Sequence, residues 1–119
     1  MLRVLGRATS VNVQKVMWLI DELGLKAERV DVGGKYGGNQ DPAYLAKNPM
    51  GLIPVLEDGD YVVWESQAIM RYILEAYGGD PWLPADLKIR GQAHQWMDWY
   101  LTVMHPPMTV IYFQMIRAT

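Results

Sequence analysis

The first 32 residues combine two short apolar runs with one longer segment of helical periodicity. Met1–Leu5 is mostly apolar and is followed by a glycine, which is typical of a strand buried on both faces. Ser10 or Asn12 can cap a helix that ends at Gly24. Its apolar face comprises Val13, Val16, Met17, Ile20 and Leu23. Lys26–Val32 has valines at alternate positions, so it predicts a second strand, and the βαβ order makes that strand parallel to the first.

The middle of the chain predicts a loop, a short helix and a hairpin. A loop with four glycines at 33–41 leads into a short helix at about 42–47, whose first position is a proline. Ile53–Leu56 and Tyr61–Trp64 are short apolar runs joined through an Asp-Gly turn. This arrangement favours two antiparallel strands.

A change of composition near residue 78 indicates a domain boundary. Before it, Ser66 can cap a long helix whose buried stripe comprises Ile69, Tyr72, Ile73 and Ala76. Residues 78–85 contain two glycines and two prolines, which are typical of a linker. We therefore expect a first domain at 1–77 and the beginning of an all-helical domain at 86–119.

The region 86–119 predicts helices with more apolar surface than they can bury themselves. Asp86 opens a helix that Pro106 and Pro107 kink or end, and Met108–Thr119 continues with helical spacing. The shared face of the first helix comprises Ile89, Ala93, Trp96, Tyr100 and Val103. Such faces have to pack on the first domain, on a second chain or on further helices that are missing from this sequence.

Composition excludes several classes of function. A chain of 119 residues is enough for one domain, or for one domain and a piece of another. The absence of cysteine removes disulfides and thiolate nucleophiles and fits a reducing compartment. The net charge of −2 gives no cationic surface for nucleic acid, and no apolar run is long enough to span a membrane. We expect a cytoplasmic protein that binds neither.

Two motifs identify the chemistry. The order βαβ, α, ββα is that of the thioredoxin fold, an α/β class. Within it, residues 48–56 read Asn-Pro-Met-Gly-Leu-Ile-Pro-Val-Leu and residues 65–69 read Glu-Ser-Gln-Ala-Ile. Together these closely resemble the N-terminal domain of glutathione transferases. The resemblance implies an enzyme that takes glutathione as cosubstrate and stabilises its thiolate for attack on a small electrophile, which the helix from Asp86 onward helps to hold.

The resemblance also implies which residues bind glutathione. The Ile53–Pro54 peptide is expected to be cis, leaving the Ile53 backbone to pair with the extended ligand. Glu65 accepts from the γ-glutamyl ammonium, and Ser66 faces the carboxylate at a helix N-terminus. From the residues alone, an ordinary trans proline and a simple helix cap are the commoner explanations.

The thiol is expected to lie near the first helix. In glutathione transferases a residue between the first strand and the first helix donates a hydrogen bond to the thiolate. The resemblance implies that Ser10 has this role here, with Asn12 as the second candidate. Asn39 is implied at the glycyl end of glutathione, and Lys35 is a weaker candidate there. Ser10 as a plain helix cap, and solvated side chains at both loop positions, remain the alternatives.

Other functions stay open at this point. The fold could serve as a non-catalytic interaction module, or as a glutathione-dependent peroxidase, isomerase or dehalogenase. His94 and His105 are eleven positions apart, so no metal site is expected. Met50 lies in a bend where members of the resembling family insert a side chain into a partner subunit, and we expect a homodimer. The alternative for Met50 is a core side chain that fills a gap.

Overall fold

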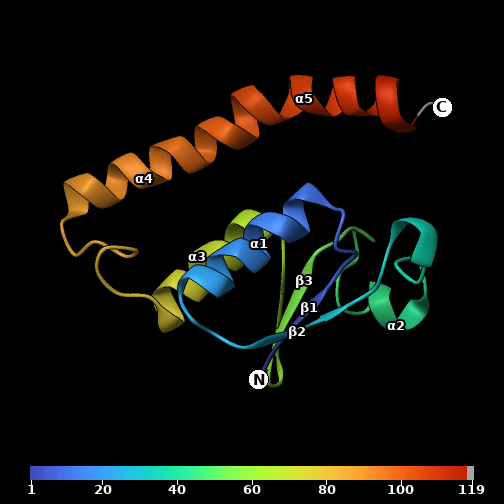
Figure 1. The fold of residues 1–119 in the computed structure, drawn as a ribbon, viewed down its shortest axis with the longest axis horizontal. Helices are drawn as coiled ribbons and strands as arrows, with labels where there is room; N and C mark the ends of the chain where they lie inside the picture. The colour runs from blue at the N-terminus through green and yellow to red at the C-terminus, as the bar shows by residue number, and fades with distance from the viewer. Residues whose placement is uncertain (118–119) are drawn as a thin grey trace. The chain divides into compact units, whose positions relative to one another are not determined.

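The computed structural model describes residues 1–117 and divides the chain after Gly79 into two units (Figure 1). The first unit is a mixed sheet with helices. Its elements are β1 (Leu2–Leu5), α1 (Val11–Glu22), β2 (Ala27–Val30), α2 (Pro42–Leu45), β3 (Val55–Asp58), β4 (Tyr61–Trp64) and α3 (Ser66–Tyr77). The sheet order is β2-β1-β3-β4, with β1 parallel to β2 and the other pairs antiparallel. This confirms the predicted thioredoxin-like arrangement.

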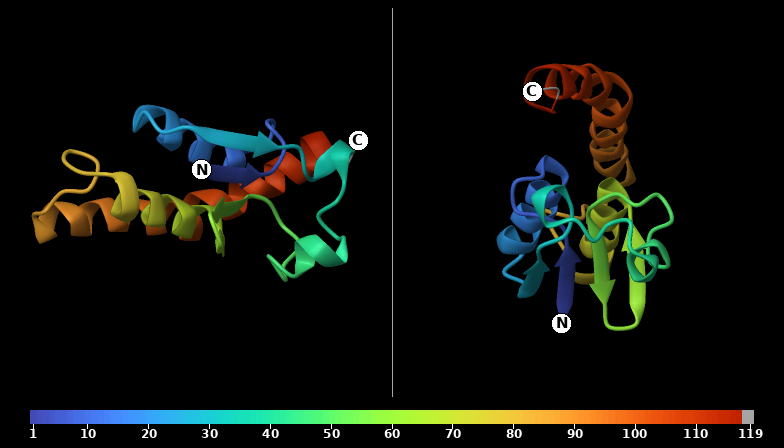
Figure 2. Two further views of the ribbon diagram at one scale, coloured as in Figure 1. Left: turned by 90° about the horizontal axis from the view of Figure 1, so that it is seen from below. Right: turned by 90° about the vertical axis from the view of Figure 1, so that its right-hand side faces the viewer.

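The alternation of side chains along the strands explains how both faces of the sheet are covered. Leu2 and Val4 point into the main core, whereas Leu5 joins a second cluster with Tyr44 of α2. The main core is completed by α1, α3 and β3, through Val13, Val16, Leu19, Ile20, Leu56, Ile69 and Ile73. Helices α1 and α3 lie side by side (Figures 1 and 2).

Several predicted boundaries are too generous. β2 spans four residues rather than seven and ends at Val30. Beyond it the two chain segments no longer form a regular ladder, although the Val32 carbonyl still accepts a hydrogen bond from the Arg7 amide. α2 ends at Leu45, and the next residues fold back as a turn. β3 begins only at Val55, since Pro54 has no N–H to donate to the sheet.

The start of α3 corrects another prediction. The residue at the N-cap is Glu65, with φ 76°, and Ser66 is the first residue of the helix rather than its cap. Ala76 is exposed rather than part of the buried stripe. The C-terminal end of α3 is joined to the end of β3, because the Tyr77 hydroxyl donates to Oδ2 of Asp58.

The second unit is one helical rod. It comprises α4 (Leu87–Trp99), a π-helical turn at Tyr100–Met104, α5 (His105–Tyr112) and a π-helical turn at Phe113–Arg117. The Asp86 carboxylate caps α4, accepting from the Lys88 amide at 2.8 Å. Pro106 and Pro107 do not end the helix: they fall in the first turn of α5, directly after the wide π turn.

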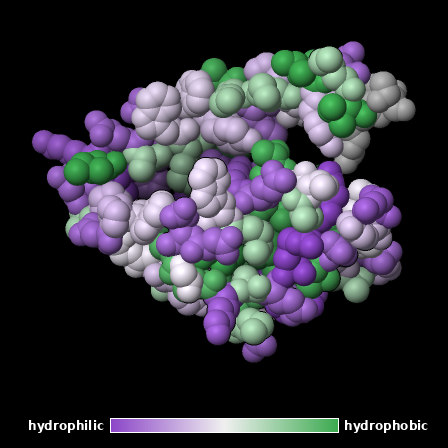
Figure 3. Space-filling model, viewed as in Figure 1, coloured by the Kyte–Doolittle hydropathy of each residue, from purple (hydrophilic) through white to green (hydrophobic). Residues whose placement is uncertain are grey.

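Apolar side chains are exposed along this rod, as the predicted excess of apolar surface requires. Figure 3 shows several of them in green over α5. They include Ile89, Trp96, Val103, Met108, Ile111, Phe113 and Met115. None of the described helices is both long enough and apolar enough to cross a membrane.

Candidate functional site

One edge of the sheet collects the predicted site residues. Val30, Leu5, Val55 and Trp64 form a single row of paired residues across the four strands. At this row β1, β2 and β4 end and β3 begins. The segments that carry Ser10, Ile53–Pro54 and Glu65–Ser66 leave or enter the sheet here, although they are up to 56 positions apart in the sequence. The topology therefore brings them to one edge.

Ser10 is buried at the start of α1. Its Oγ accepts a hydrogen bond from the Val13 amide at 3.5 Å, so the expected capping role is confirmed. That bond uses a lone pair of the hydroxyl, and its proton can be donated to another group. Asn12 lies half-buried in the first turn of the same helix. Both side chains therefore remain candidates for a thiolate, next to the positive end of α1.

The Ile53–Pro54 peptide is cis, as expected. Ile53 lies just outside the β1–β3 ladder, which begins at Val55. A Cβ placed on Gly6 would lie 2.5 Å from Cγ2 of Val13, so glycine lets the chain beyond β1 pack closely against α1. The same Cβ would be at ordinary contact distances from Ile53 and Pro54, which shows that Gly6 lies next to the cis peptide.

Two polar side chains, Asn48 and Tyr44, shape the bend that precedes Ile53, and we call this pair the clasp. Asn48 is 1% exposed; its Nδ2 donates to the Leu52 carbonyl at 2.9 Å and its Oδ1 accepts from the Met50 amide at 2.9 Å. The Tyr44 hydroxyl also donates to the Leu52 carbonyl. Sequence reasoning missed this clasp, although an Asn before a proline at the end of a short helix is a signal for such a turn.

The two residues predicted at the glycyl end of glutathione differ in their surroundings. Nδ2 of Asn39 donates to the Gly51 carbonyl at 2.8 Å, so this side chain joins the glycine-rich loop to the bend. Lys35 is exposed in a 3₁₀ turn, with Nζ 5.1 Å from the centre of the Tyr36 ring. That bond uses the amide group of the Asn39 side chain, whereas the side chain of Lys35 is exposed to solvent.

Glu65 combines an unusual backbone with a cationic neighbour. Within residues 1–117 it is the one non-glycine residue with positive φ, a conformation that costs about 1–3 kcal/mol. Lys15 of α1 has a buried ammonium nitrogen; burial lowers the pKa of Lys15, and the nearby Glu65 carboxylate opposes that shift. Ser66 follows with 5% exposure, at the first turn of α3. The site thus pairs a carboxylate with the unsatisfied amides of a helix N-terminus.

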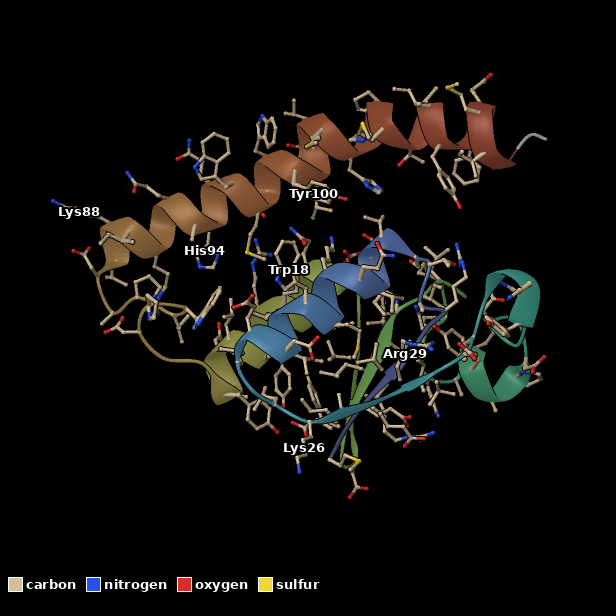
Figure 4. The ribbon with its side chains drawn as sticks, viewed as in Figure 1. Trp18, Lys26, Arg29, Lys88, His94 and Tyr100 are labelled. Atoms are coloured by element: carbon tan, nitrogen blue, oxygen red, sulfur yellow. The ribbon has the colours of Figure 1, made fainter. Side chains whose placement is uncertain are left out.

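The two histidines belong to the second unit. Nδ1 of His105 lies 3.3 Å from the Tyr100 hydroxyl, and its Nε2 lies 3.2 Å from Oγ of Thr109. His94 is exposed on α4 (Figure 4). Across the part of the chain that the structure describes, no three His, Asp or Glu side chains gather in a way that could hold a metal ion.

Residues 1–75 match the family model described as glutathione S-transferase, N-terminal domain. The chain is 41% identical over 102 residues to glutathione S-transferase GstB of Escherichia coli, covering 83% of this chain and 49% of that protein. It is 43% identical over 99 residues to glutathione S-transferase F10 of Arabidopsis thaliana, covering 82% and 46%. It therefore spans about half the length of the curated relatives it matches.

A solved structure extends the similarity to the fold. The theta class glutathione S-transferase of Xanthomonas axonopodis pv. citri, solved with glutathione bound, superposes with a TM-score of 0.90 at 38% identity. The match covers 98% of this chain and 56% of that one.

Proposed function

Because the chain belongs to the glutathione S-transferase family through its N-terminal domain, we propose that it binds glutathione and activates its thiol for attack on a small electrophile. The observation that supports this proposal is the single end of the sheet at which the segments carrying Ser10, Ile53 and Ser66 leave or enter the strands. At this end of the sheet an extended peptide can pair with the protein backbone at Ile53. Its charged ends can then be bound by charged side chains on either side.

The γ-glutamyl group fits the start of α3. The ammonium of that group pairs with the Glu65 carboxylate, and its carboxylate accepts from Ser66 and the first amides of the helix. The cysteinyl part pairs with the backbone of Ile53, which lies outside the ladder. Asn39 and Lys35 remain the candidates for the glycyl carboxylate.

Ser10 then stabilises the thiolate by donating its hydroxyl proton. Lowering a thiol pKa from about 8.5 to about 6.5 requires roughly 2.7 kcal/mol. A hydrogen bond to a charged group contributes about 1.5–3 kcal/mol, and a helix N-terminus about 0.3–1 kcal/mol more. These contributions suffice without a general base. Asn12 can donate from its amide in the same place.

The same proposal includes a cytoplasmic, homodimeric protein that detoxifies electrophiles. The side chain of Met50 is 57% exposed and that of Leu52 is 66% exposed. Met50 is therefore not a core residue of this chain, and the exposed pair supports a contact with a second copy.

Calorimetric titration with glutathione tests the function directly. We expect saturable binding, and we expect Ser66→Ala to weaken it about tenfold, since a donor to the ligand carboxylate is lost. Lys26→Met, an exposed change at the start of β2, is the control and should bind as the wild type does. Absence of glutathione binding by the wild-type chain contradicts the proposal.

A further inference from the structure

Arg7 stands at the candidate site without an acidic partner among residues 1–117. It lies where β1 ends, three positions before Ser10. Arg3 is paired with two glutamates, and Arg29 contacts Asp31 at 2.6 Å. No described carboxylate oxygen lies within 4.0 Å of a nitrogen of Arg7. A half-buried guanidinium left in this state has its strongest interaction unused.

The backbone of Arg7 is held by hydrogen bonds, and its side chain lies against Gly34. Its amide donates to the Val32 carbonyl at 2.9 Å, and its carbonyl accepts from the Ser10 amide at 3.3 Å. A Cβ on Gly34 would lie 2.8 Å from Cδ and 3.0 Å from Nε of Arg7. The arginine therefore occupies the space that any other residue at position 34 would fill.

The guanidinium also borders the segment proposed to bind the peptide. A Cβ on Gly33 would lie 3.4 Å from Nη1 of Arg7 and 3.1 Å from Cδ1 of Ile53. Both side chains thus reach the same glycine at the edge of the sheet. This places the positive charge beside Ile53 and near the N-terminus of α1, which adds to the positive potential.

We propose that Arg7 binds a carboxylate of one reactant and so gives the site a preference for anionic ligands. The inference rests on the proposed glutathione chemistry. The guanidinium suits this role because its planar, permanently charged fork matches a carboxylate with two parallel hydrogen bonds. The carboxylate can come from the glycyl end of glutathione or from the electrophile, and the chemistry of recognition is the same in both cases.

Two pairs of probes distinguish these sources in the full chain. The first pair is glutathione and its glycine amide, compared by calorimetric affinity. The second is iodoacetate and iodoacetamide, compared by enzymatic kcat/KM after subtraction of the uncatalysed rate. In that reaction the thiolate sulfur bonds to the methylene carbon, the carbon–iodine bond breaks, iodide leaves, and the thiol proton passes to solvent. Each pair differs in one carboxylate.

Arg7→Met should reduce the preference for the charged member of one pair by about tenfold to a hundredfold. Arg7→Lys, which keeps the charge but loses the fork, should give an intermediate loss and decides the matter if Arg7→Met does not fold. Lys26→Met removes the same charge from the start of β2, where Figure 4 labels it, and should leave both preferences unchanged.

The outcomes separate the two proposals. A loss confined to the glutathione pair assigns Arg7 to the glycyl carboxylate, and one confined to the iodoacetate pair assigns it to the electrophile. If the wild type binds glutathione and both preferences survive in the Arg7 variants, the inference is wrong and the proposed function stands. If the wild type does not bind glutathione, both are wrong.

Discussion

The Tyr72 hydroxyl of α3 donates a hydrogen bond of 2.6 Å to Oδ2 of Asp58, the last residue of β3. Tyr77 donates to the same oxygen at 2.6 Å from the last residue of the helix. The Tyr61 ring of β4 lies 4.8 Å from the Tyr72 ring, measured between centroids. The hairpin turn and the C-terminal end of α3 are therefore tied together, at the end of the sheet opposite the candidate site.

Tyr72→Phe should destabilise the protein by about 0.5–1 kcal/mol, because it removes a hydrogen bond to a charged group that is partly exposed to solvent. Urea unfolding followed by circular dichroism measures this change. Tyr36→Phe, at an exposed tyrosine of the glycine-rich loop, is the matched control and should leave the free energy of unfolding unaltered. Equal stabilities of Tyr72→Phe and wild type would show that the bond contributes nothing.

The same bond should make stability depend on pH at both extremes. Hydrogen bonds from Tyr72 and then Tyr77 lower the pKa of Asp58, so its contribution is present above the unfolded pKa near 4 and is lost as pH falls through the lower folded pKa. The bond to Asp58 raises the pKa of Tyr72 to about 12. The contribution of that tyrosine is fully present below about pH 10 and is lost as pH rises toward 12.

The stability difference between wild type and Tyr72→Phe should therefore be level from about pH 5 to pH 9 and shrink outside that window. Unfolding curves across the range provide the test. A difference that stays constant down to pH 2 would mean that Asp58 is not the acceptor in solution.

Asn48→Ala should cost about 1–3 kcal/mol, because it removes two hydrogen bonds that a buried side chain makes to the backbone of the bend, and the Met50 amide loses its partner while the Leu52 carbonyl keeps Tyr44. Since the bend leads directly into Ile53, glutathione affinity should fall as well. Thermal unfolding and calorimetry measure the two effects. Asn12→Ala, at a half-buried amide outside the bend, is the control for stability. Loss of stability with unchanged affinity would limit the clasp to a structural role.

The sequence predicted most of the fold because local signals and topology agree. Helical spacing and a C-terminal glycine predicted α1, and the Asp-Gly signal predicted the hairpin, although Asp58 still pairs with Tyr61 and the loop consists of the next two residues. Two local predictions were wrong because the residue types there carry no signal for the structure that forms. A glutamate rarely adopts positive φ, so residue type could not reveal Glu65 as the N-cap, and a π turn that accommodates Pro106 has no sequence signature here.

The candidate site residues come from sequence motifs, whereas the contacts around them become visible only in the structure. Ser10, Ile53 and Ser66 lie in segments whose patterns are visible in the sequence. Lys15 and Arg7 become significant only through packing, since each looks like an ordinary surface cation in the sequence. Their neighbours, Glu65 and Gly34, are 50 and 27 positions away along the chain. Such contacts between distant residues depend on the assembled sheet edge.

Lys15→Met should weaken glutathione binding about threefold to tenfold while leaving a long side chain in the same space, because Glu65 loses the cation that offsets and orients it. The effect should disappear with a glutathione analogue that lacks the α-amino group, since Glu65 then has no ammonium to bind. Lys15→Arg should restore most of the affinity. An equal loss for both ligands would assign Lys15 to stability instead.

Ser10→Ala should change glutathione affinity little but raise the pKa of the bound thiol, because the lost hydrogen bond favours only the thiolate. Ultraviolet absorbance of the bound thiolate against pH measures the shift, which we expect to be about 1–2 units. Asn12→Ala, measured in parallel, identifies the donor if Ser10→Ala titrates as the wild type does.

Met50→Asp should dissociate the expected homodimer. Met50 lies on an exposed bend that Asn48 and Tyr44 hold rigid, so its side chain is presented to a partner without a cost in ordering the backbone. A carboxylate there would be buried without a counter-charge in an apolar contact, which costs far more than one buried methionine contributes. Sedimentation velocity over a range of concentrations measures the dissociation constant. Val11→Asp, an equal change in charge at a residue 60% exposed in the first turn of α1, should sediment as the wild type does. A wild type that is monomeric at every concentration, or a Met50→Asp variant that dimerises as tightly as the wild type, would exclude Met50 as the contact.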